Sequence, residues 1–358
     1  AVEHTPASIV ITRLDGTIEY VNSGFVKTTG YAPQEVLGEN PRLLKSGLQP
    51  PSFYADLWQT ILQGHEWRGR FHNRRKDGTL FWEQATILSI TGNDGTITHF
   101  VAVKEDITER VATEEDSRLR LERARRHRDA LQRLAGEQAI TSGDVEEGLH
   151  AIIHAAMDAT QVGRASVWLL NSDQSAMECR YRHDLSPHNS SVPDIVAASD
   201  CPQLVAILQA ERVIDVGDVR TDPRVREVAA THLLPRNVTS LLLSPIRRGG
   251  RLVGAVCLGH VGAPRDWAPS EASFAAQIAD QVAQLLGNAE EKRAQTRLRE
   301  QHALFHTVLD AMPVLVMTKD RQGVYLEAND ACLKFLGRSR ADVVGRTDFD
   351  LFSAEVAE

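Results

Sequence analysis

Residues 9–38 read IVITRLDGTIEYVNSGFVKTTGYAPQEVLG, and residues 316–345 read VMTKDRQGVYLEANDACLKFLGRSRADVVG. Both stretches carry Gly, Asn, Gly and Gly at intervals of six, eight and eight residues, and the two copies lie 307 residues apart. The matched positions are Gly16, Asn22, Gly30 and Gly38 in the first copy and Gly323, Asn329, Gly337 and Gly345 in the second. A unit that occurs twice, with other sequence between the copies, indicates an array of modules rather than a single catalytic domain.

Length and composition predict two to three globular domains. The chain has 358 residues, of which 42% are hydrophobic and 25% are charged, so it has enough apolar side chains for real cores. Its net charge of −8 argues against broad binding to nucleic acid or to anionic membranes, because both require a basic field.

Cysteine usage and the lack of targeting signals bear on the compartment. Cys179, Cys201, Cys257 and Cys332 lie far apart without a CxxC pair, which argues against a disulfide framework or a zinc site. No apolar stretch approaches the roughly 18–20 residues of a membrane span, and no signal peptide is visible. We expect a cytoplasmic protein without a metal site. Because the chain opens on Ala1, we also expect it to be part of a longer protein.

The first 108 residues predict an antiparallel sheet with helices on one face, an α+β architecture. Turn sequences at Asp15-Gly16, Asp77-Gly78 and Asn93-Asp94-Gly95 separate the strand candidates. The expected order is two strands within 8–22, short helices within 23–46, a helix over 51–63, and strands over 66–75, 79–91 and 97–105.

Residues 109–139 are expected to form a helical linker. Thirteen of the 21 residues from 109 to 129 are charged, and Leu121, Ala124 and Leu131 form a thin heptad-spaced stripe. One interpretation is a solvated connecting helix, in which His127 is exposed. The other is a coiled coil that makes the chain a homodimer, since a narrow apolar seam is what two paired helices bury.

A second α+β domain is expected over 140–288. It comprises a helix with His150 and His154 one turn apart, strands over 164–171 and 175–183, and a hairpin that turns at Gly249-Gly250. Cys179 and Cys257 fall in strands and are expected to be small buried hydrophobes. A closing helix runs on through a second linker, 289–304, where Val282, Leu285 and Leu298 would extend the dimer stripe. Residues 305–358 then hold only the first half of the repeated unit.

Three segments resemble known signalling domains. Residues 1–108 resemble a PAS domain in Asp15-Gly16, Asn22, GYAPQEVLG (30–38) and NRRKDGTLFW (73–82), with Asp106-Ile107-Thr108 just past the last predicted strand. Residues 140–288 resemble a GAF domain in RASVWLL (164–170) and LLLSPIRRGGRLVGAVCLGHVG (241–262). Residues 305–358 resemble the first half of another PAS domain. The resemblance implies a sensory region of a bacterial sensor histidine kinase or cyclic-di-GMP signalling protein.

The first PAS segment is similar to flavin-binding PAS domains of the light-sensing LOV class and of redox sensors in nitrogen-fixation regulation. The similarity rests on Leu57-Trp58, Trp67-Arg68-Gly69 and the run from Asn73. It implies an apolar slot for the ring, an amide from Asn73 at the ring edge, and Arg42 near the cofactor phosphate. Trp67 shares the strand parity of Asn73 and is expected in the same slot. The candidate cofactor-binding residues are Asn73, Trp67, Arg42, Asn40, Trp58 and Glu83.

The same segment departs from the LOV pattern Asn-Cys-Arg-Phe-Leu-Gln, because Pro41 stands where the photoactive cysteine would be. Residues 1–178 contain no cysteine, so a cysteinyl–flavin photoadduct is excluded in this domain. Lys45, Glu83 and Lys104 replace LOV amides. FAD in a redox-type pocket is one interpretation; a PAS hairpin with a solvated basic turn and an apolar core is another, and a different ligand is a third.

The sequence therefore predicts a sensory module that detects a small ligand or redox state and transmits it through dimeric helical linkers. No histidine-kinase box, ATP-binding glycine motif, GGDEF run or P-loop occurs, so we expect no enzymatic activity in these residues, with an output domain downstream. The alternatives are a flavin-dependent oxidoreductase and a ligand-free dimerisation spacer. No ligand is assigned to the GAF segment.

Overall fold

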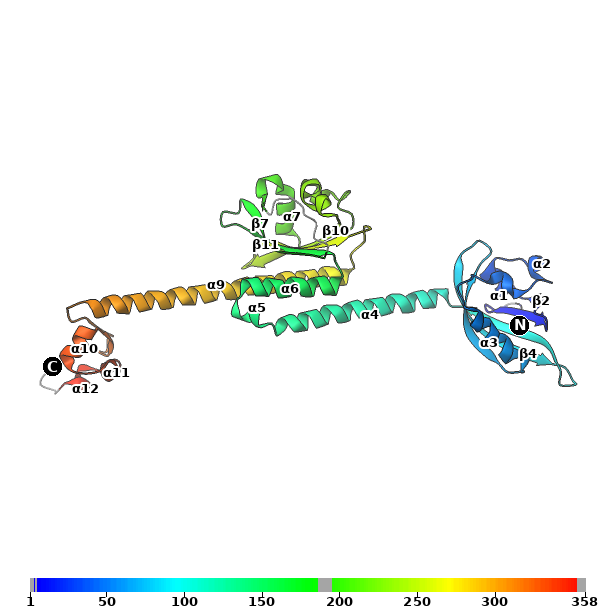
Figure 1. The fold of residues 1–358 in the computed structure, drawn as a ribbon, viewed down its shortest axis with the longest axis horizontal. Helices are drawn as coiled ribbons and strands as arrows, with labels where there is room; N and C mark the ends of the chain where they lie inside the picture. Colours follow the sequence, from blue (N-terminus) through cyan, green and yellow to red (C-terminus); the bar gives the residue numbers. More distant parts are fainter. Residues whose placement is uncertain (1–2, 4, 186–194, 353–358) are drawn as a thin grey trace. The chain divides into compact units, whose positions relative to one another are not determined.

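The computed structural model describes residues 3, 5–185 and 195–352, which form two compact units, 1–122 and 123–358. Figure 1 shows the elements of each unit along the chain. Every strand pair in the three sheets is antiparallel, and helices pack against the sheets. The predicted α+β class, with antiparallel sheets and long helices, is therefore confirmed.

The first unit is built on a five-stranded sheet of order β2-β1-β5-β4-β3. The predicted order of two strands, helices and three strands is observed. The elements are β1 (Ser8–Arg13), β2 (Ile18–Val21), α1 (Ser23–Thr29), α2 (Pro33–Val36), the 3-10 turn η2 (Pro41–Leu44), α3 (Pro51–Leu62), β3 (Trp67–Arg74), β4 (Leu80–Thr91) and β5 (Ile97–Asp106).

A single buried asparagine joins β1 to α1. The side-chain oxygen of Asn22 accepts hydrogen bonds from the backbone N–H groups of Ile9 and Phe25, at 2.9 and 3.0 Å. It therefore anchors the start of β1 and caps α1 at the same time. Its side-chain amide donates to the carbonyl of Ala7 at 2.9 Å. Asn22 is fully buried, so these bonds satisfy backbone groups that water cannot reach.

The C-terminal copy of the repeat reproduces this joint. The side-chain oxygen of Asn329 accepts from the N–H groups of Val316 and Cys332, both at 3.0 Å, and its amide donates to the carbonyl of Val314 at 2.8 Å. The elements of this copy are β12 (Met317–Lys319), β13 (Tyr325–Ala328), α10 (Asp330–Leu336), α11 (Arg340–Val343) and α12 (Asp348–Leu351). Their strands form a two-stranded sheet.

The second unit contains a six-stranded sheet of order β8-β7-β6-β11-β10-β9. Its elements are α5 (Gln138–Ser142), α6 (Val145–Thr160), β6 (Arg164–Leu170), β7 (Ala176–Asp184), β8 (Ile195–Ala197), η3 (Ala198–Asp200), α7 (Pro202–Ala210), β9 (Ile214–Val216), η4 (Pro223–Val225), α8 (Arg226–Val228), the π-turn η5 (Ala229–Leu233), η6 (Leu234–Arg236), β10 (Val238–Arg248), β11 (Arg251–Val261) and α9 (Pro269–Ala311). Helices α6 and α9 cover one face, and α7 lies over the other (Figure 1).

The charged helix α4 (Thr108–Ala135) ends inside the core of the second unit. Ala130 and Leu134 are buried there, and Leu131 packs against the same cluster. The expectation that His127 is solvated is wrong: the ring is buried and stacks on Phe274 at 4.3 Å between centroids. Burial lowers the pKa of His127, so the ring packs as a neutral group at pH 7.

Four other side chains differ from their expected surroundings. Val282 and Leu285, assigned from sequence to an intermolecular stripe, are fully buried in the core of the second unit and are not available to another chain. Cys257 lies in a strand as expected but is only partly buried, as is Cys179. Across the described residues, no helix is both long and apolar enough to cross a bilayer.

Replacing Leu134 with Ala tests whether α4 belongs to this core. Truncating a buried leucine costs about 2–5 kcal/mol, so amide exchange in β10 and β11 should accelerate. Leu121→Ala is the matched control on the same helix, because Leu121 is 54% exposed and its truncation should cost less than about 0.5 kcal/mol. Hydrogen exchange is the suitable measurement because it reports the stability of the second unit separately from that of the first. Equal protection in both variants would show that the end of α4 is dispensable to the core.

Candidate functional site

A cavity of about 340 Å³ lies in the first unit, where α3 and the η2 segment face the sheet. Its walls are mostly apolar and aromatic, and its polar groups are few. The lining comprises Val10, Thr12, Gly16, Asn40, Pro41, Arg42, Lys45, Tyr54, Leu57, Trp58, Ile61, Phe71, Asn73, Ile87, Phe100, Ala102 and Lys104. The volume lies within the range of small-molecule sites, roughly 300–1,000 Å³.

Strand periodicity explains why two strands contribute most of the floor. Side chains two residues apart share one face of a strand, so Phe100, Ala102 and Lys104 of β5 point the same way. Phe71 and Asn73 of β3 do likewise. Helix α3 supplies the opposite wall, where Trp58 meets Phe100 edge to face with centroids 6.0 Å apart.

A buried charged network stands beside the polar end of the cavity. The side-chain amide of Asn73 donates to a Glu83 carboxylate oxygen at 2.9 Å, and the ammonium of Lys104 donates to the same oxygen at 3.1 Å. Glu83 is fully buried and its other oxygen has no partner among the described residues. Because a carboxylate only accepts hydrogen bonds, Asn73 must turn its NH₂ toward Glu83, and its carbonyl oxygen remains available as an acceptor.

The η2 segment is tied to the same strand. Lys45 and Asn73 form an isolated antiparallel bridge, and the ammonium of Lys45 lies 3.7 Å from the centroid of the Tyr54 ring. The side chain of Asn40 accepts from the backbone N–H of Arg42 at 3.1 Å, which begins the η2 turn. This turn places Pro41 in the cavity wall, at the position where a LOV domain carries its cysteine.

The structure brings four of the six candidate cofactor-binding residues into the lining: Asn73, Arg42, Asn40 and Trp58. Glu83 lies behind the wall, bonded to Asn73 and Lys104. Trp67 has the expected strand parity but is not in the lining. Its indole N–H donates to Asp56 at 2.9 Å, and its ring packs edge to face on Phe53.

Sequence reasoning did not select Lys45, Lys104 or Tyr54 as site residues. Lys104 had a detectable signal, because it shares strand parity with Phe100 and Ala102, which are both buried. Tyr54 had a weaker one: it stands one helical turn before Trp58. For Lys45 the signal was its place at a LOV amide position, although the irregular segment after η2 gave no periodicity from which to place it.

Comparison with known families agrees with the three parts of the fold. Residues 6–109 match the PAS domain family, residues 144–286 match the GAF domain family, and residues 309–358 match the PAS fold family. The chain therefore contains a PAS domain, a GAF domain and a second PAS domain, in that order.

Similar proteins match over roughly a third of this chain. The nitrogen fixation regulatory protein of Klebsiella oxytoca is 36% identical over 107 residues, which cover 30% of this chain and 22% of that protein. Blue-light-activated histidine kinase 1 of Erythrobacter litoralis is 32% identical over 139 residues, which cover 39% of this chain and 36% of that protein. This chain thus spans about a fifth of the length of the first of these relatives.

Among solved structures, the LOV domain of a blue-light activated histidine kinase from Erythrobacter litoralis is 27% identical. The match covers 29% of this chain and 99% of that chain, with a TM-score of 0.28.

The buried Glu83–Lys104 pair makes a testable contribution to stability. Lys104→Met leaves a buried carboxylate without its counter-charge and should lower the free energy of unfolding by about 3–5 kcal/mol. The double variant Glu83→Gln/Lys104→Met removes both charges and should recover most of that loss. A double-mutant cycle, read by amide exchange in β3, β4 and β5, measures the coupling. Additive effects of the two changes would contradict a direct interaction.

Proposed function

We propose that this chain is the sensory part of a bacterial signal-transduction protein, and that its first PAS domain holds a flavin, in the form of FAD. The observation that carries the proposal is the cavity beneath α3, which combines aromatic walls with two side-chain amides, two ammonium groups and one guanidinium. A flavin supplies redox chemistry when bound; the protein supplies the slot and the hydrogen bonds around it.

Four polar residues have a defined task in this proposal. The carbonyl oxygen of Asn73, oriented by Glu83, accepts a hydrogen bond from the imide N–H of the ring. Lys45 and Lys104 donate to ring carbonyls, and Arg42 meets the phosphate. Trp58 and Phe100 contact the ring through their faces and edges. The lining residues therefore offer the apolar surface and the hydrogen-bonding groups that a flavin requires.

The relatives bear on what is sensed. One is a nitrogen fixation regulatory protein and another is a blue-light-activated histidine kinase. The wall of the present cavity carries Pro41 instead of a thiol, and no cysteine occurs in residues 1–178. We propose redox state or a small ligand as the signal, since covalent photochemistry at a cysteine has no thiol to use.

Strand β5 connects the cavity to the first linker helix. Lys104 lines the cavity. Asp106, on the same face of the strand, accepts a hydrogen bond from the Arg75 guanidinium at 2.7 Å. Asp106 also accepts from the Thr108 hydroxyl at 2.6 Å, and the oxygen of that hydroxyl accepts from the backbone N–H of Trp82 at 2.9 Å. A bound group that changes its charge beside Lys104 would therefore alter the electrostatic field only two residues before Asp106, whose hydrogen bonds hold the start of α4. Such a joint can bias the helix between two arrangements.

Pairing of the helices between two copies of the chain is part of the proposal. Leu298, Phe305 and Met312 recur every seven residues at the end of α9 and beyond, and their side chains are 60%, 56% and 38% exposed. Every residue from 291 to 300 is exposed. A helix with so little buried surface is marginal alone, whereas a heptad seam pairs well with a second copy.

Two other functions remain as outcomes of the same experiments. A flavin-dependent oxidoreductase would turn over NAD(P)H, and a ligand-free spacer would contain no cofactor.

The purified chain should carry a yellow chromophore that is released by denaturation and identified as FAD by chromatography. It should not catalyse sustained NAD(P)H oxidation.

Asn73→Ala should weaken flavin binding by about two- to tenfold, since one hydrogen bond at the ring edge contributes roughly 0.5–1.5 kcal/mol. The measurement is the flavin-to-protein ratio after dialysis, followed by titration of the emptied protein with FAD. Asn93→Ala is the matched control, because Asn93 is exposed in the turn between β4 and β5. Equal affinity in both variants would remove Asn73 from the site, and no FAD in any preparation would remove the cofactor.

Phe305→Glu should shift the chain from dimer to monomer in sedimentation velocity at micromolar concentration, because it places a charge in the proposed seam. Thr296→Glu introduces the same charge on the face of the helix opposite the proposed seam and should leave the dimer intact. A parent chain that stays monomeric up to about 100 micromolar would contradict the paired-helix proposal.

A further inference from the structure

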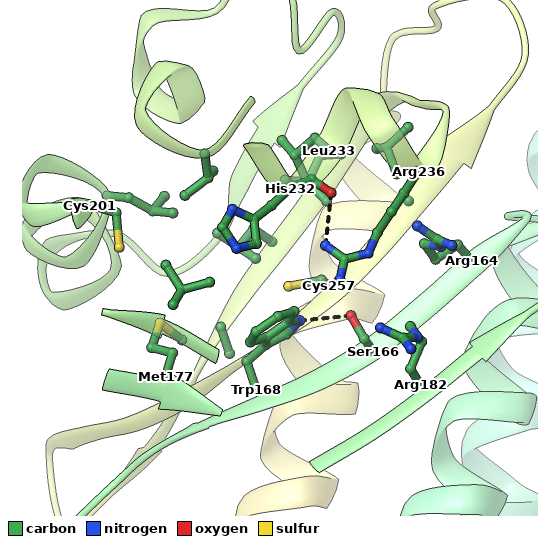
Figure 2. Close-up of a pocket in the computed structure, with 18 of the residues that line it drawn as sticks. Arg164, Ser166, Trp168, Met177, Arg182, Cys201, His232, Leu233, Arg236 and Cys257 are labelled. Atoms are coloured by element: carbon green, nitrogen blue, oxygen red, sulfur yellow. Dashed lines mark hydrogen bonds between the residues drawn. The ribbon is translucent and has the colours of Figure 1, made fainter. Parts of the chain in front are cut away.

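The GAF domain contains a second cavity, of about 90 Å³, on the face of its sheet opposite α6 and α9. Strands β6 and β11 form its floor, and α7 with the 226–236 segment forms its roof (Figure 2). An apolar cavity of roughly 150 Å³ holds a benzene-sized molecule. A cavity of about 90 Å³ therefore takes a ligand of only a few heavy atoms.

One end of this cavity carries three arginines, two of which, Arg164 and Arg182, are ion-paired with Asp184. Arg164, Arg182 and Arg236 gather there, whereas Met177 and Cys201 lie at the opposite end (Figure 2). The described lining contains no carboxylate. The remaining walls are largely aliphatic, from α7, β10 and β11. The cavity is thus apolar along most of its surface and positive at one end.

The described residues leave one donor of Arg164 without a hydrogen-bond partner. Its side chain is 8% exposed, and its Nε and Nη2 atoms donate to the two oxygens of Asp184. Its Nη1 atom is buried and has no hydrogen-bond partner among the described residues. A buried donor on a charged group is costly to leave unpaired, so this atom is the expected contact of an anionic ligand.

The neighbouring groups support anion binding. Arg236 is buried and donates from Nη1 to the carbonyl of His232 at 3.0 Å, which holds its guanidinium at the cavity (Figure 2). Although the residue as a whole is only partly buried, desolvation of its thiol raises the pKa of Cys257 to about 12, so the thiol is neutral at pH 7 and does not repel an anion. Gly259 lies next to Arg164 in the lining, and a Cβ at this position would crowd the side chain of Val238 at 3.2 Å.

We propose that the GAF domain binds a small aliphatic monocarboxylate, with its carboxylate on Arg164 and Arg236 and its short hydrocarbon chain toward Met177 and Cys201. A planar carboxylate matches the two parallel N–H groups of a guanidinium. The apolar end offers few groups that would bind hydroxyls or a second charge. The volume restricts the chain to a few carbon atoms.

Isothermal titration calorimetry of the full chain with sodium butyrate tests the site, with butyramide as the neutral isostere and inorganic phosphate as the competing anion. We expect one saturable butyrate site per chain and no measurable binding of butyramide. Absence of saturable butyrate binding at concentrations on the order of 10 mM would overturn the proposal. Equal binding of butyramide, or tighter binding of phosphate, would overturn it as well.

Two variants locate the binding. Arg236→Gln should weaken butyrate binding by about ten- to hundredfold, through loss of a charge-assisted hydrogen bond. Cys257→Leu keeps every charge and fills the cavity, so it should abolish binding even if Arg236→Gln folds poorly. Arg251→Gln, at an exposed position of β11, and Asn73→Ala in the first PAS domain should retain the parent affinity. Butyrate binding retained in Cys257→Leu would show that the ligand sits elsewhere.

Discussion

The hydrogen bonds of one buried carboxamide underlie both PAS domains. In each copy an asparagine oxygen accepts from a backbone N–H at or directly before the first strand and from a helix N–H, and its amide donates to a backbone carbonyl further upstream. Asn22 and Asn329 therefore fix the angle between the first hairpin and the first helix. In the first PAS domain the strand that this joint anchors, β1, also supplies Val10 and Thr12 to the cavity wall.

Local signals were sufficient to predict most of the elements. Turn glycines separate the strands, and the spacing of Phe53, Leu57 and Ile61 gives α3 within one residue of its observed end. His127 could not be placed in the same way. It stands among seven arginines in a stretch that looks solvated, and its partner, Phe274, lies 147 residues away. Contacts between residues so far apart follow from tertiary packing, which periodicity does not contain.

In the candidate site, too, some residues could be predicted from local sequence and others depended on tertiary structure. Asn73, Asn40, Arg42 and Trp58 were assigned through motif resemblance and line the cavity. Trp67 was assigned by strand parity, which is correct but says nothing of position along the strand. The Glu83–Lys104 pair required the register of β4 against β5, where Glu83 lies opposite Asp106. A register is set by the whole sheet, so no short stretch of sequence could reveal that two apparent amide replacements neutralise each other.

Helix α9 runs without interruption from Pro269, at the edge of the GAF core, to Ala311, beside the second PAS domain. At about 1.5 Å per residue, its 43 residues extend roughly 65 Å. Each residue turns the helix by about 100°, so the number of residues between its two ends fixes the rotational phase of one relative to the other. Insertions of seven or eleven residues would nearly preserve that phase, and insertions of one or two would not. Insertions and deletions within 291–300 are therefore constrained by the rotation they impose between the two ends of α9, although every residue there is exposed in the single chain.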